Sequence, residues 1–341
     1  MGTPVADLSE STAMGISRFL ALLLCWNIFL AASEAAHCPD VEAFRPCTCD
    51  HEGINCMKAN STQELIRAFR TPGANEHESL WIQKTPIQSF PAGVLGDFKF
   101  RHVQLEINAN LTAFDLGSLN NTKKFLVSIS LFKNALSSFD FKGISSFPKL
   151  LTLNLGKNKL RTIPAQAFSN PTLEALVLSE NPIVSVGANA FAGLRSLKEL
   201  FLSGTRLTTL GDYSMRMLSD QPGLTINLAD SLISSISRTA FTGTAPQRLD
   251  LSGNNLTTLS KDVFGPLLVR MLRSPGQFGQ APMLALGNNP LSCYGCSFRW
   301  LVPLRTRRGF NSMLFDFACR DGTPFFGLTY SKIRCDQNGP F

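Results

Sequence analysis

Short segments with apolar residues two positions apart recur along the chain, each followed three positions later by a small polar residue. The clearest copy is LNLGKNKL, in which Leu153, Leu155 and Leu160 are apolar and Asn158 is the polar residue. Successive side chains of a strand point to opposite faces. Leu153 and Leu155 are therefore expected to point inward from a short strand, with Asn154 pointing outward.

The same pattern, L-x-L-x-x-N-x-L, is recognised nine times. Its asparagine position falls at Thr85, Asn110, Asn134, Asn158, Asn181, Thr205, Ser231, Asn254 and Asn289. The steps between these positions are 25, 24, 24, 23, 24, 26, 23 and 35 residues. A period of roughly 20–29 residues with this signature is typical of leucine-rich repeats. The predicted fold is an α/β solenoid, a leucine-rich repeat horseshoe with a parallel β-sheet on its concave face.

The asparagine column turns each repeat inward, where its side chains can hydrogen-bond backbone groups of adjacent turns. Threonine and serine are expected to do this less completely. Asn110 also begins one of four N-glycosylation sequons, and a buried ladder residue cannot carry a glycan. We therefore expect Asn110 to belong to the ladder, and glycans to be attached at Asn60, Asn120 and Asn255.

The segments that return from one strand to the next carry a second apolar column. Its members are Phe168, Phe191, Met215, Phe241 and Phe264. Large apolar side chains at a fixed repeat position favour a buried spine over an aromatic ligand site.

The last step of the pattern is 35 residues, and its excess lies near Met271–Met283 (MLRSPGQFGQAPM). Glycine and proline are frequent in this segment, which predicts a loop at the edge or on the convex side. A structureless insertion and a partner-binding loop are equally compatible with its composition.

The first 36 residues have the pattern of a secretory signal peptide. Arg18 precedes an apolar run from Phe19 to Leu30, and small residues up to Ala36 suit cleavage before His37. The run is shorter than the roughly 20 residues that a membrane span needs, and no later stretch is long enough. These features predict a secreted, extracellular protein without a membrane span.

Cysteines are confined to the two ends of the chain that remains after cleavage. They are Cys38, Cys47, Cys49, Cys56, Cys293, Cys296, Cys319 and Cys335. Even numbers in a secreted chain indicate disulfides, and a solenoid needs caps over its exposed core at both ends. Spacing leaves three pairings open in each cap, and the last four thiols can also bind zinc, although the oxidising secretory route favours disulfides.

These observations predict four regions. They are a removed signal peptide at 1–36, an N-terminal cysteine cap and lead-in at 37–75, about nine repeats at 76–291 with an insertion near 271–283, and a C-terminal cysteine cap and tail at 292–341. Without residues 1–36 the chain has 31 basic and 22 acidic residues, a net charge of +9.

A basic patch at Arg305, Arg307 and Arg308 lies in the C-terminal cap. Such a patch can bind sulfated glycans by charge, although a solvated cap surface is the more ordinary interpretation. The secretory route argues against nucleic acid as a partner.

Motifs that carry chemistry are not found. The sequence has no HExxH zinc-protease motif, no G-x-S-x-G nucleophile elbow, no phosphate-binding glycine loop and no calcium loop. Four histidines are present, at positions 37, 51, 77 and 102. We therefore predict a protein that is not an enzyme and has no cofactor and no metal, although a triad assembled in space leaves no sequence motif.

The outward strand positions are the better candidates for a functional site. In this register they include Trp81, Glu106, Ser130, Phe132, Asn154, Val177, Phe201, Asn227, Asp250 and Ala285. Outward aromatic and aliphatic side chains on a rigid sheet often mark protein interfaces, whereas scattered surface hydrophobes are the bland alternative.

The cap CPDVEAFRPCTCDHEGINC, the repeats LNLGKNKL and LDLSGNNL, and the second cap NPLSCYGCSFRWL together resemble secreted leucine-rich repeat proteins with cysteine caps. The resemblance implies the pairs Cys38–Cys49, Cys47–Cys56, Cys293–Cys319 and Cys296–Cys335. The spacing Cys293-x-x-Cys296 departs from the more common C-x-C of such C-terminal caps.

The first cap and repeats (ESLWIQKTPIQSFPAGVLGDF) resemble, more narrowly, an arthropod group named after the Oplophorus-luciferin 2-monooxygenase non-catalytic subunit. This resemblance implies a non-catalytic subunit that binds another secreted protein. The leading hypothesis is a secreted scaffold that offers its concave sheet to a secreted or cell-surface protein. The alternative is an extracellular-matrix or glycan-binding component that acts through the basic C-terminal cap.

Overall fold

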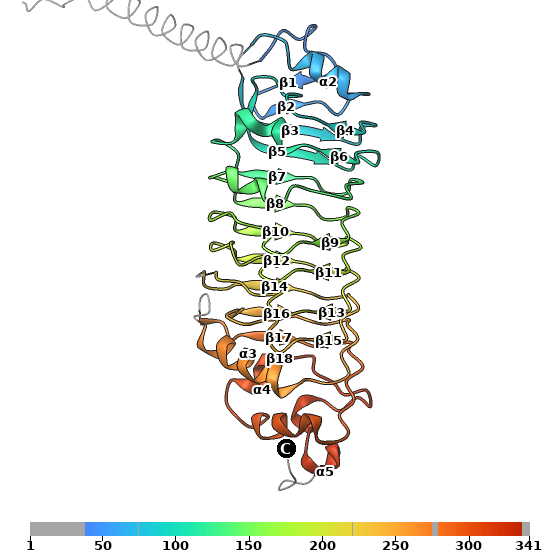
Figure 1. Ribbon diagram of the computed structural model, residues 1–341, viewed down its shortest axis with the longest axis vertical. Helices are drawn as coiled ribbons and strands as arrows, with labels where there is room; N and C mark the ends of the chain where they lie inside the picture. Colours follow the sequence, from blue (N-terminus) through green and yellow to red (C-terminus); the bar gives the residue numbers. More distant parts are fainter. Residues whose placement is uncertain (1–37, 74, 220, 275–278, 336–341) are drawn as a thin grey trace, which may run out of the picture.

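Short strands lie across the long axis of the molecule and are stacked one after another along it, where they form one twelve-stranded sheet (Figure 1). The computed structural model describes residues 38–73, 75–219, 221–274 and 279–335, so the expected signal peptide at 1–36 lies outside the described residues. The strands, in spatial order, are β1 (Thr48–Cys49), β2 (Gly53–Asn55), β3 (Glu76–Gln83), β5 (Lys99–Glu106), β7 (Ser128–Ser130), β8 (Thr152–Asn154), β10 (Ala175–Val177), β12 (Glu199–Phe201), β14 (Thr225–Asn227), β16 (Arg248–Asp250), β17 (Met283–Ala285) and β18 (Leu314–Phe315).

Neighbouring strands of this sheet are parallel from β2 to β18, and only β1 pairs antiparallel with β2. Each turn of the chain thus adds one strand beside the previous one. The predicted parallel solenoid of leucine-rich repeats is confirmed.

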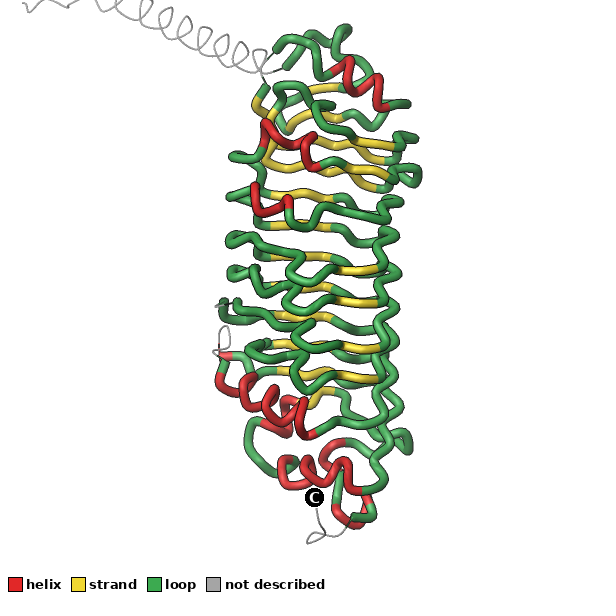
Figure 2. Tube along the Cα trace, viewed as in Figure 1, coloured by secondary structure: helices red, strands yellow, loops and turns green. Residues whose placement is uncertain are grey.

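Outside the large sheet, strands are short and helices gather toward the two ends (Figure 2). Three two-stranded sheets pair β4 (Ser89–Phe90) with β6 (Ala113–Phe114), β9 (Thr162–Ile163) with β11 (Ser185–Val186), and β13 (Thr209–Leu210) with β15 (Ser235–Ile236). The helices are α2 (Thr62–Ala68), η1 (Leu116–Thr122), η2 (Gly143–Ser146), α3 (Lys261–Arg273), η4 (Cys296–Leu304), α4 (Phe310–Met313), η5 (Phe325–Gly327) and α5 (Tyr330–Ile333).

The core lies between the large sheet and the return segments. The inward residues Leu153 and Leu155 are fully buried, as the alternating pattern predicts. Burial of one such side chain contributes about 1.5–3 kcal/mol. The predicted apolar spine is also confirmed: Phe168, Phe191, Met215, Phe241 and Phe264 are each at most 2% exposed. Because every turn repeats these positions, the core is one continuous column.

Buried asparagines join each turn to its neighbours. The Asn158 side-chain amide donates to the carbonyl oxygens of Leu131 at 2.8 Å and Leu155 at 3.0 Å, and its Oδ1 accepts from the Leu136 N–H at 3.1 Å. Asn181 repeats the arrangement one turn later, with Leu155 and Leu178 as acceptors. These side chains satisfy backbone groups that the turn would otherwise bury without partners.

Three positions of this ladder, Thr85, Thr205 and Ser231, carry hydroxyl groups and make fewer contacts than the asparagines. Thr205 and Ser231 bond to each other at 2.9 Å, and the Ser231 hydroxyl also accepts from the Thr205 N–H at 3.1 Å. A hydroxyl has one proton, whereas an amide nitrogen has two. The expectation that threonine and serine satisfy the turn less completely is therefore confirmed.

The ladder position of the second repeat is Asn108, and the prediction of Asn110 was wrong. Asn108 is fully buried, donates to the Ile82 carbonyl at 2.9 Å and accepts from the Thr85 N–H at 2.9 Å. Asn110 is exposed. One extra residue follows Asn108, so the apolar residue that normally lies two positions after the asparagine is Leu111. The conflict between ladder and sequon at Asn110 therefore does not exist.

Helix α3 (Lys261–Arg273) fills much of the long last step, which the sequence pattern did not predict. Residues 275–278 of the predicted loop lie outside the described residues, so the loop stays a prediction. Met271 is fully buried at the end of this helix, and Met283 begins strand β17. Arg270 holds the helix against the preceding turn, because its guanidinium donates to the carbonyl oxygens of Thr244 and Phe241, both at 2.9 Å. Burial lowers the pKa of this guanidinium. The buried apolar residues of this segment recur at helical spacing, and they stabilise a helix although glycines and prolines lie nearby.

Two disulfides close each end of the column. They join Cys38 to Cys49, Cys47 to Cys56, Cys293 to Cys319 and Cys296 to Cys335. These are the pairs that the resemblance to cysteine-capped proteins implied, so the zinc alternative for the second cap is wrong.

The corrected ladder makes a prediction about stability. Asn158→Ala should lower the free energy of unfolding by about 3 kcal/mol, because it leaves the Leu136 N–H and two carbonyl oxygens buried without partners. Asn110→Ala is the matched control and should change it by less than about 0.5 kcal/mol, because Asn110 is exposed. Urea titration of both variants measures the difference, and equal losses would contradict the assignment.

Candidate functional site

Strand register places the outward side chains of the large sheet in straight rows, and we call this side of the sheet the sheet face. One row runs through Trp81, Gln104, Ser130, Asn154, Val177, Phe201, Asn227 and Asp250. The predicted Glu106 pairs with Gln83 and lies in the neighbouring row. It still faces outward, because an error of two residues in the register keeps the same face. Ala285 was predicted to be available on this face but is only 5% exposed.

An apolar patch forms at the middle of the sheet face from Phe132, Gly156, Val177 and Phe201. A methyl group at Gly156 would lie 3.3 Å from Phe132 Cδ2 and 3.4 Å from Val177 Cγ1, so these two side chains flank the glycine. Val177 pairs in register with Phe201 on the next strand. Phe132, Val177 and Phe201 are half-buried, and each leaves part of its surface in contact with solvent.

Trp81 does not join this patch. Gln104, Ser130 and Asn154 separate it from Val177 along the row. The structure therefore divides the predicted apolar residues into one cluster of neighbours and one isolated, half-buried tryptophan.

Three of the predicted face residues also hydrogen-bond to the backbone of the turn that follows their strand. The side-chain oxygens of Asn154, Asn227 and Asp250 accept from the backbone N–H two residues later, at 2.9, 3.0 and 2.9 Å. Such local bonds fix the side chain and stabilise the bend. These residues thus hold the face in shape as well as line it.

A polar cluster occupies the N-terminal part of the sheet face and was missed in the sequence. His102 Nδ1 lies 2.7 Å from the Ser128 hydroxyl, and His102 Nε2 lies 3.4 Å from Glu78 Oε1. His102 and Ser128 pair in register, one position before the inward residues of their strands. With a correct register, this alignment was readable from the sequence.

Serine, histidine and glutamate in this order are the side chains of a hydrolytic triad, but the sheet gives them a poor setting for catalysis. Backbone N–H groups of a sheet point toward neighbouring strands, whereas side chains stand on its face. Ser128 pairs with strands on both sides, so its strand directs these donors away from the hydroxyl. Acyl transfer needs donors aimed at the developing oxyanion. Arg101 also competes for Glu78, with Nε 3.6 Å from Oε2.

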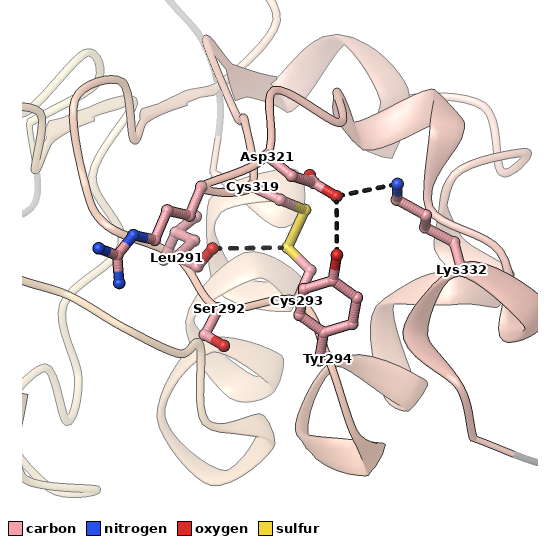
Figure 3. A pocket seen from close by; sticks show the side chains of 8 residues that line it. Leu291, Ser292, Cys293, Tyr294, Cys319, Asp321 and Lys332 are labelled. Carbon is pink, nitrogen blue, oxygen red and sulfur yellow. Dashed lines mark hydrogen bonds and ion pairs between the residues drawn. A yellow bond between two sulfur atoms is a disulfide. The ribbon is translucent and has the colours of Figure 1, made fainter.

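A small pocket lies beside the Cys293–Cys319 disulfide in the C-terminal cap (Figure 3). Asp321 is its centre: Lys332 Nζ lies 2.8 Å from Oδ2, the Tyr294 hydroxyl donates to Oδ2 at 3.3 Å, and the Thr323 hydroxyl donates to Oδ1 at 2.7 Å. The bonds from Lys332 and Thr323 hold the pKa of Asp321 far below its usual range, and the Asp321 carboxylate raises the pKa of Lys332. These polar groups satisfy one another, which indicates a structural role.

The basic residues of this cap differ in what they do. Arg305 is half-buried, and its guanidinium donates to the Leu328 carbonyl at 2.6 Å. Arg307 and Arg308 are exposed. Binding of sulfated glycans by the three remains a prediction, although one of them is engaged by the fold.

Three further predictions concern glycosylation, metal binding and membrane spans. Asn60, Asn120 and Asn255 are exposed, and their glycosylation remains a prediction. Within the described residues, no cluster of three or more histidine, cysteine, aspartate or glutamate side chains is placed to hold a metal. Helices long and apolar enough to cross a membrane are likewise not found in that part of the chain.

Comparison with known proteins supports the fold and the resemblance. Residues 171–220 and 246–267 match models of the leucine rich repeat. The chain is 27% identical over 302 residues to the Oplophorus-luciferin 2-monooxygenase non-catalytic subunit of Oplophorus gracilirostris, which covers 79% of this chain and 80% of that protein. The predicted resemblance to this subunit and to leucine-rich repeat proteins is confirmed.

Other relatives match parts of longer proteins. Identity is 32% to the transforming growth factor beta activator LRRC32 of Mus musculus, over 59% of this chain and 28% of that protein. It is 30% to Tsukushi of Gallus gallus, over 55% of this chain and 48% of that protein. The chain therefore spans less than half the length of these two relatives.

A solved structure shows the same architecture. A chain in the octameric complex of Latrophilin 3, Unc5D and FLRT2 (LRR) is 21% identical, with a TM-score of 0.55, over 88% of this chain and all of that chain. At this identity the similarity establishes the fold alone.

The geometry of the C-terminal cap predicts a pH-dependent contribution to stability. In a Trp81→Phe background, where the fluorescence of the chain that begins at His37 comes from Trp300, Asp321→Asn should lower the urea midpoint of the cap at pH 7. Because the pKa of Asp321 is lower in the folded chain than in the unfolded chain, its contribution is present above about pH 4 and is lost as the pH falls below that value. The difference between the variant and the Trp81→Phe protein should therefore shrink on acidification.

Asp97→Asn is the control, because Asp97 is exposed and its carboxylate has no hydrogen-bond or ion-pair partner among the described residues. A difference for Asp321→Asn that persists unchanged down to pH 2, or an equal effect of Asp97→Asn, would contradict the assignment.

Proposed function

We propose that the protein is a secreted, non-catalytic binding subunit that presents its sheet face to another secreted or cell-surface protein. The observation that carries the proposal is the apolar patch of Phe132, Gly156, Val177 and Phe201 on a rigid sheet. Partly exposed aromatic and aliphatic side chains grouped on a fixed surface are typical of interface centres. Polar residues around the patch supply the rim that such interfaces have.

The similarity to the Oplophorus-luciferin 2-monooxygenase non-catalytic subunit supports a narrower form of the proposal. In that form the partner is the catalytic member of a luciferin-monooxygenase-like secreted complex. This chain then orients or stabilises the partner and carries out no chemistry itself. The poor setting of Ser128 for acyl transfer is in line with such a division of labour.

Secretion is supported by the four disulfides, because such bonds form and persist in oxidising compartments. The proposed regions keep the boundaries set out for the sequence: a removed signal at 1–36, a cap at 37–75, repeats at 76–291 and a cap with its tail at 292–341. Asn60, Asn110, Asn120 and Asn255 are proposed to be accessible to glycosylation, since all four are exposed.

Two simple measurements test secretion. Protein collected from culture medium should begin at His37 on N-terminal sequencing, and glycosidase treatment should lower its apparent mass. Retention inside the cell with an intact N-terminus would contradict the extracellular assignment.

The binding proposal is tested by comparing what variants recover from the native secreted fraction. The wild-type protein should co-purify a partner, and Val177→Glu/Phe201→Glu should reduce its recovery roughly tenfold or more, because buried charges at an interface centre lack partners. Val184→Glu is the matched control, since Val184 is 48% exposed and lies outside the large sheet. Trp81→Ala should have a smaller effect than the double variant.

Equal recovery by the double variant and the wild-type protein would place the interface elsewhere. The narrower form makes a further demand: the recovered complex should oxidise a luciferin, and the separated chain should not. A partner without oxidoreductase activity would contradict the narrower form and leave the binding proposal standing.

A further inference from the structure

A second surface feature lies at the C-terminal end of the column, away from the apolar patch. Residues of helix α3 and of the cap segments η4 and α4 line a cavity of about 770 Å³ that is open to solvent. Cavities of roughly 300–1,000 Å³ are the size that holds small organic ligands. We call this cavity the cap groove.

The floor of the cap groove is apolar. Leu268 and Val269 contribute from α3, and Trp300, Leu304 and Phe310 contribute from the cap. Trp300 is fixed, because its indole N–H donates to the Leu259 carbonyl at 2.9 Å. That bond leaves the ring as an apolar surface without a free donor. Val269 is 41% exposed, so this floor is accessible from solvent.

The rim of the cap groove is mainly cationic. Arg238, Lys261 and Arg307 line it, against the single carboxylate of Asp262. Neither Arg238 nor Arg307 forms an ion pair with a carboxylate of the described residues. Both side chains are exposed at the edge of the floor. An anion on the groove would therefore not displace an ion pair of either arginine.

Asp212 lies close enough to Arg238 for their charges to interact, but its carboxylate is hydrogen-bonded to other residues. Asp212 accepts hydrogen bonds from the hydroxyl groups of Ser237 and Thr239, the latter at 2.5 Å. Those bonds lower the pKa of Asp212, and the charge of Arg238 lowers it further. Because Arg238 is exposed, lines the groove and forms no ion pair with Asp212, its guanidinium can still approach a ligand there.

We propose that the cap groove binds an amphipathic organic anion, a molecule with an apolar body and one acidic group. The apolar floor would take the body of the ligand, and Arg238 and Arg307 would pair with its carboxylate, sulfate or phosphate. The proposal does not depend on the sheet face, because the lining residues belong to different elements.

Two dyes of the same shape separate the apolar and ionic parts of this proposal. The anionic probe is 8-anilinonaphthalene-1-sulfonate, and the neutral probe is N-phenyl-1-naphthylamine, which has the same ring system without the sulfonate. In the chain that begins at His37, Trp81 and Trp300 are the two tryptophans. Trp81→Phe therefore makes energy transfer to the bound dye a report from Trp300 in the groove floor.

In this Trp81→Phe protein, titration with the anionic dye should give saturable transfer from Trp300 that weakens as salt is added. Arg238→Gln/Arg307→Gln should weaken its binding roughly five- to tenfold and leave the neutral dye within about twofold. Arg206→Gln/Arg308→Gln is the matched control, since both arginines are exposed and neither lines the groove. Val269→Glu should weaken both dyes.

Three results would overturn the proposal. The first is the lack of saturable transfer from Trp300. The second is an equal loss of anionic dye in the two double variants, which would mean attraction by net charge alone. The third is unchanged binding of both dyes to Val269→Glu. Thermal unfolding of each variant, expected to match the Trp81→Phe protein, ensures that a loss of binding does not reflect a loss of the fold.

Discussion

The hydrogen bonds of the buried asparagine ladder are the constraint on which the stack depends. Each turn from β7 to β17 bends sharply after a strand of only three residues, and the bend buries backbone groups that the sheet does not pair. Asn158 binds carbonyl oxygens of its own turn and of the preceding turn, and it accepts an N–H of the preceding turn. A buried group left without a partner costs about 1–3 kcal/mol, so the amide both permits the bend and sets the spacing of the turns.

The spacing of the turns determines which side chains become neighbours on the sheet face. Because each turn adds a strand in register, side chains four residues before the asparagine line up as a row, and Val177 comes to lie beside Phe201. The backbone beneath them is paired on both sides, so the row is fixed before any partner arrives. A preorganised surface loses little freedom on binding, which favours a solenoid face as an interaction surface. The disulfides at both ends protect the ends of the same core.

The sequence pattern predicted the fold because it repeats, and it misplaced residues where the repetition breaks. The spine from Phe168 to Phe264 was readable because its members recur once in every turn. Asn108 was missed because one extra residue after it moved the expected leucine to position 111. Helix α3 was missed because the glycines and prolines beyond its end were weighed above the buried Val263, Leu267 and Met271 of the helix itself.

Residues that meet only in space were harder to predict. His102 and Ser128 come together through the register of two strands, which a slip in the ladder assignment conceals. The cap groove joins Arg238, on a return segment, to Trp300 and Arg307 in the cap. No local pattern links these positions, because the long last turn and helix α3 bring them to one cavity.

Hydroxyl-radical footprinting of the free chain and of its native complex tests the central claim most directly. Phe132 and Phe201 should be oxidised more slowly in the complex, because a partner on the sheet face excludes water and radicals from the apolar patch. Phe326, which is 78% exposed in the C-terminal cap, should be oxidised at the same rate in both states. Unchanged oxidation of Phe132 and Phe201, with protection at other positions, would show that the sheet face is not the interface.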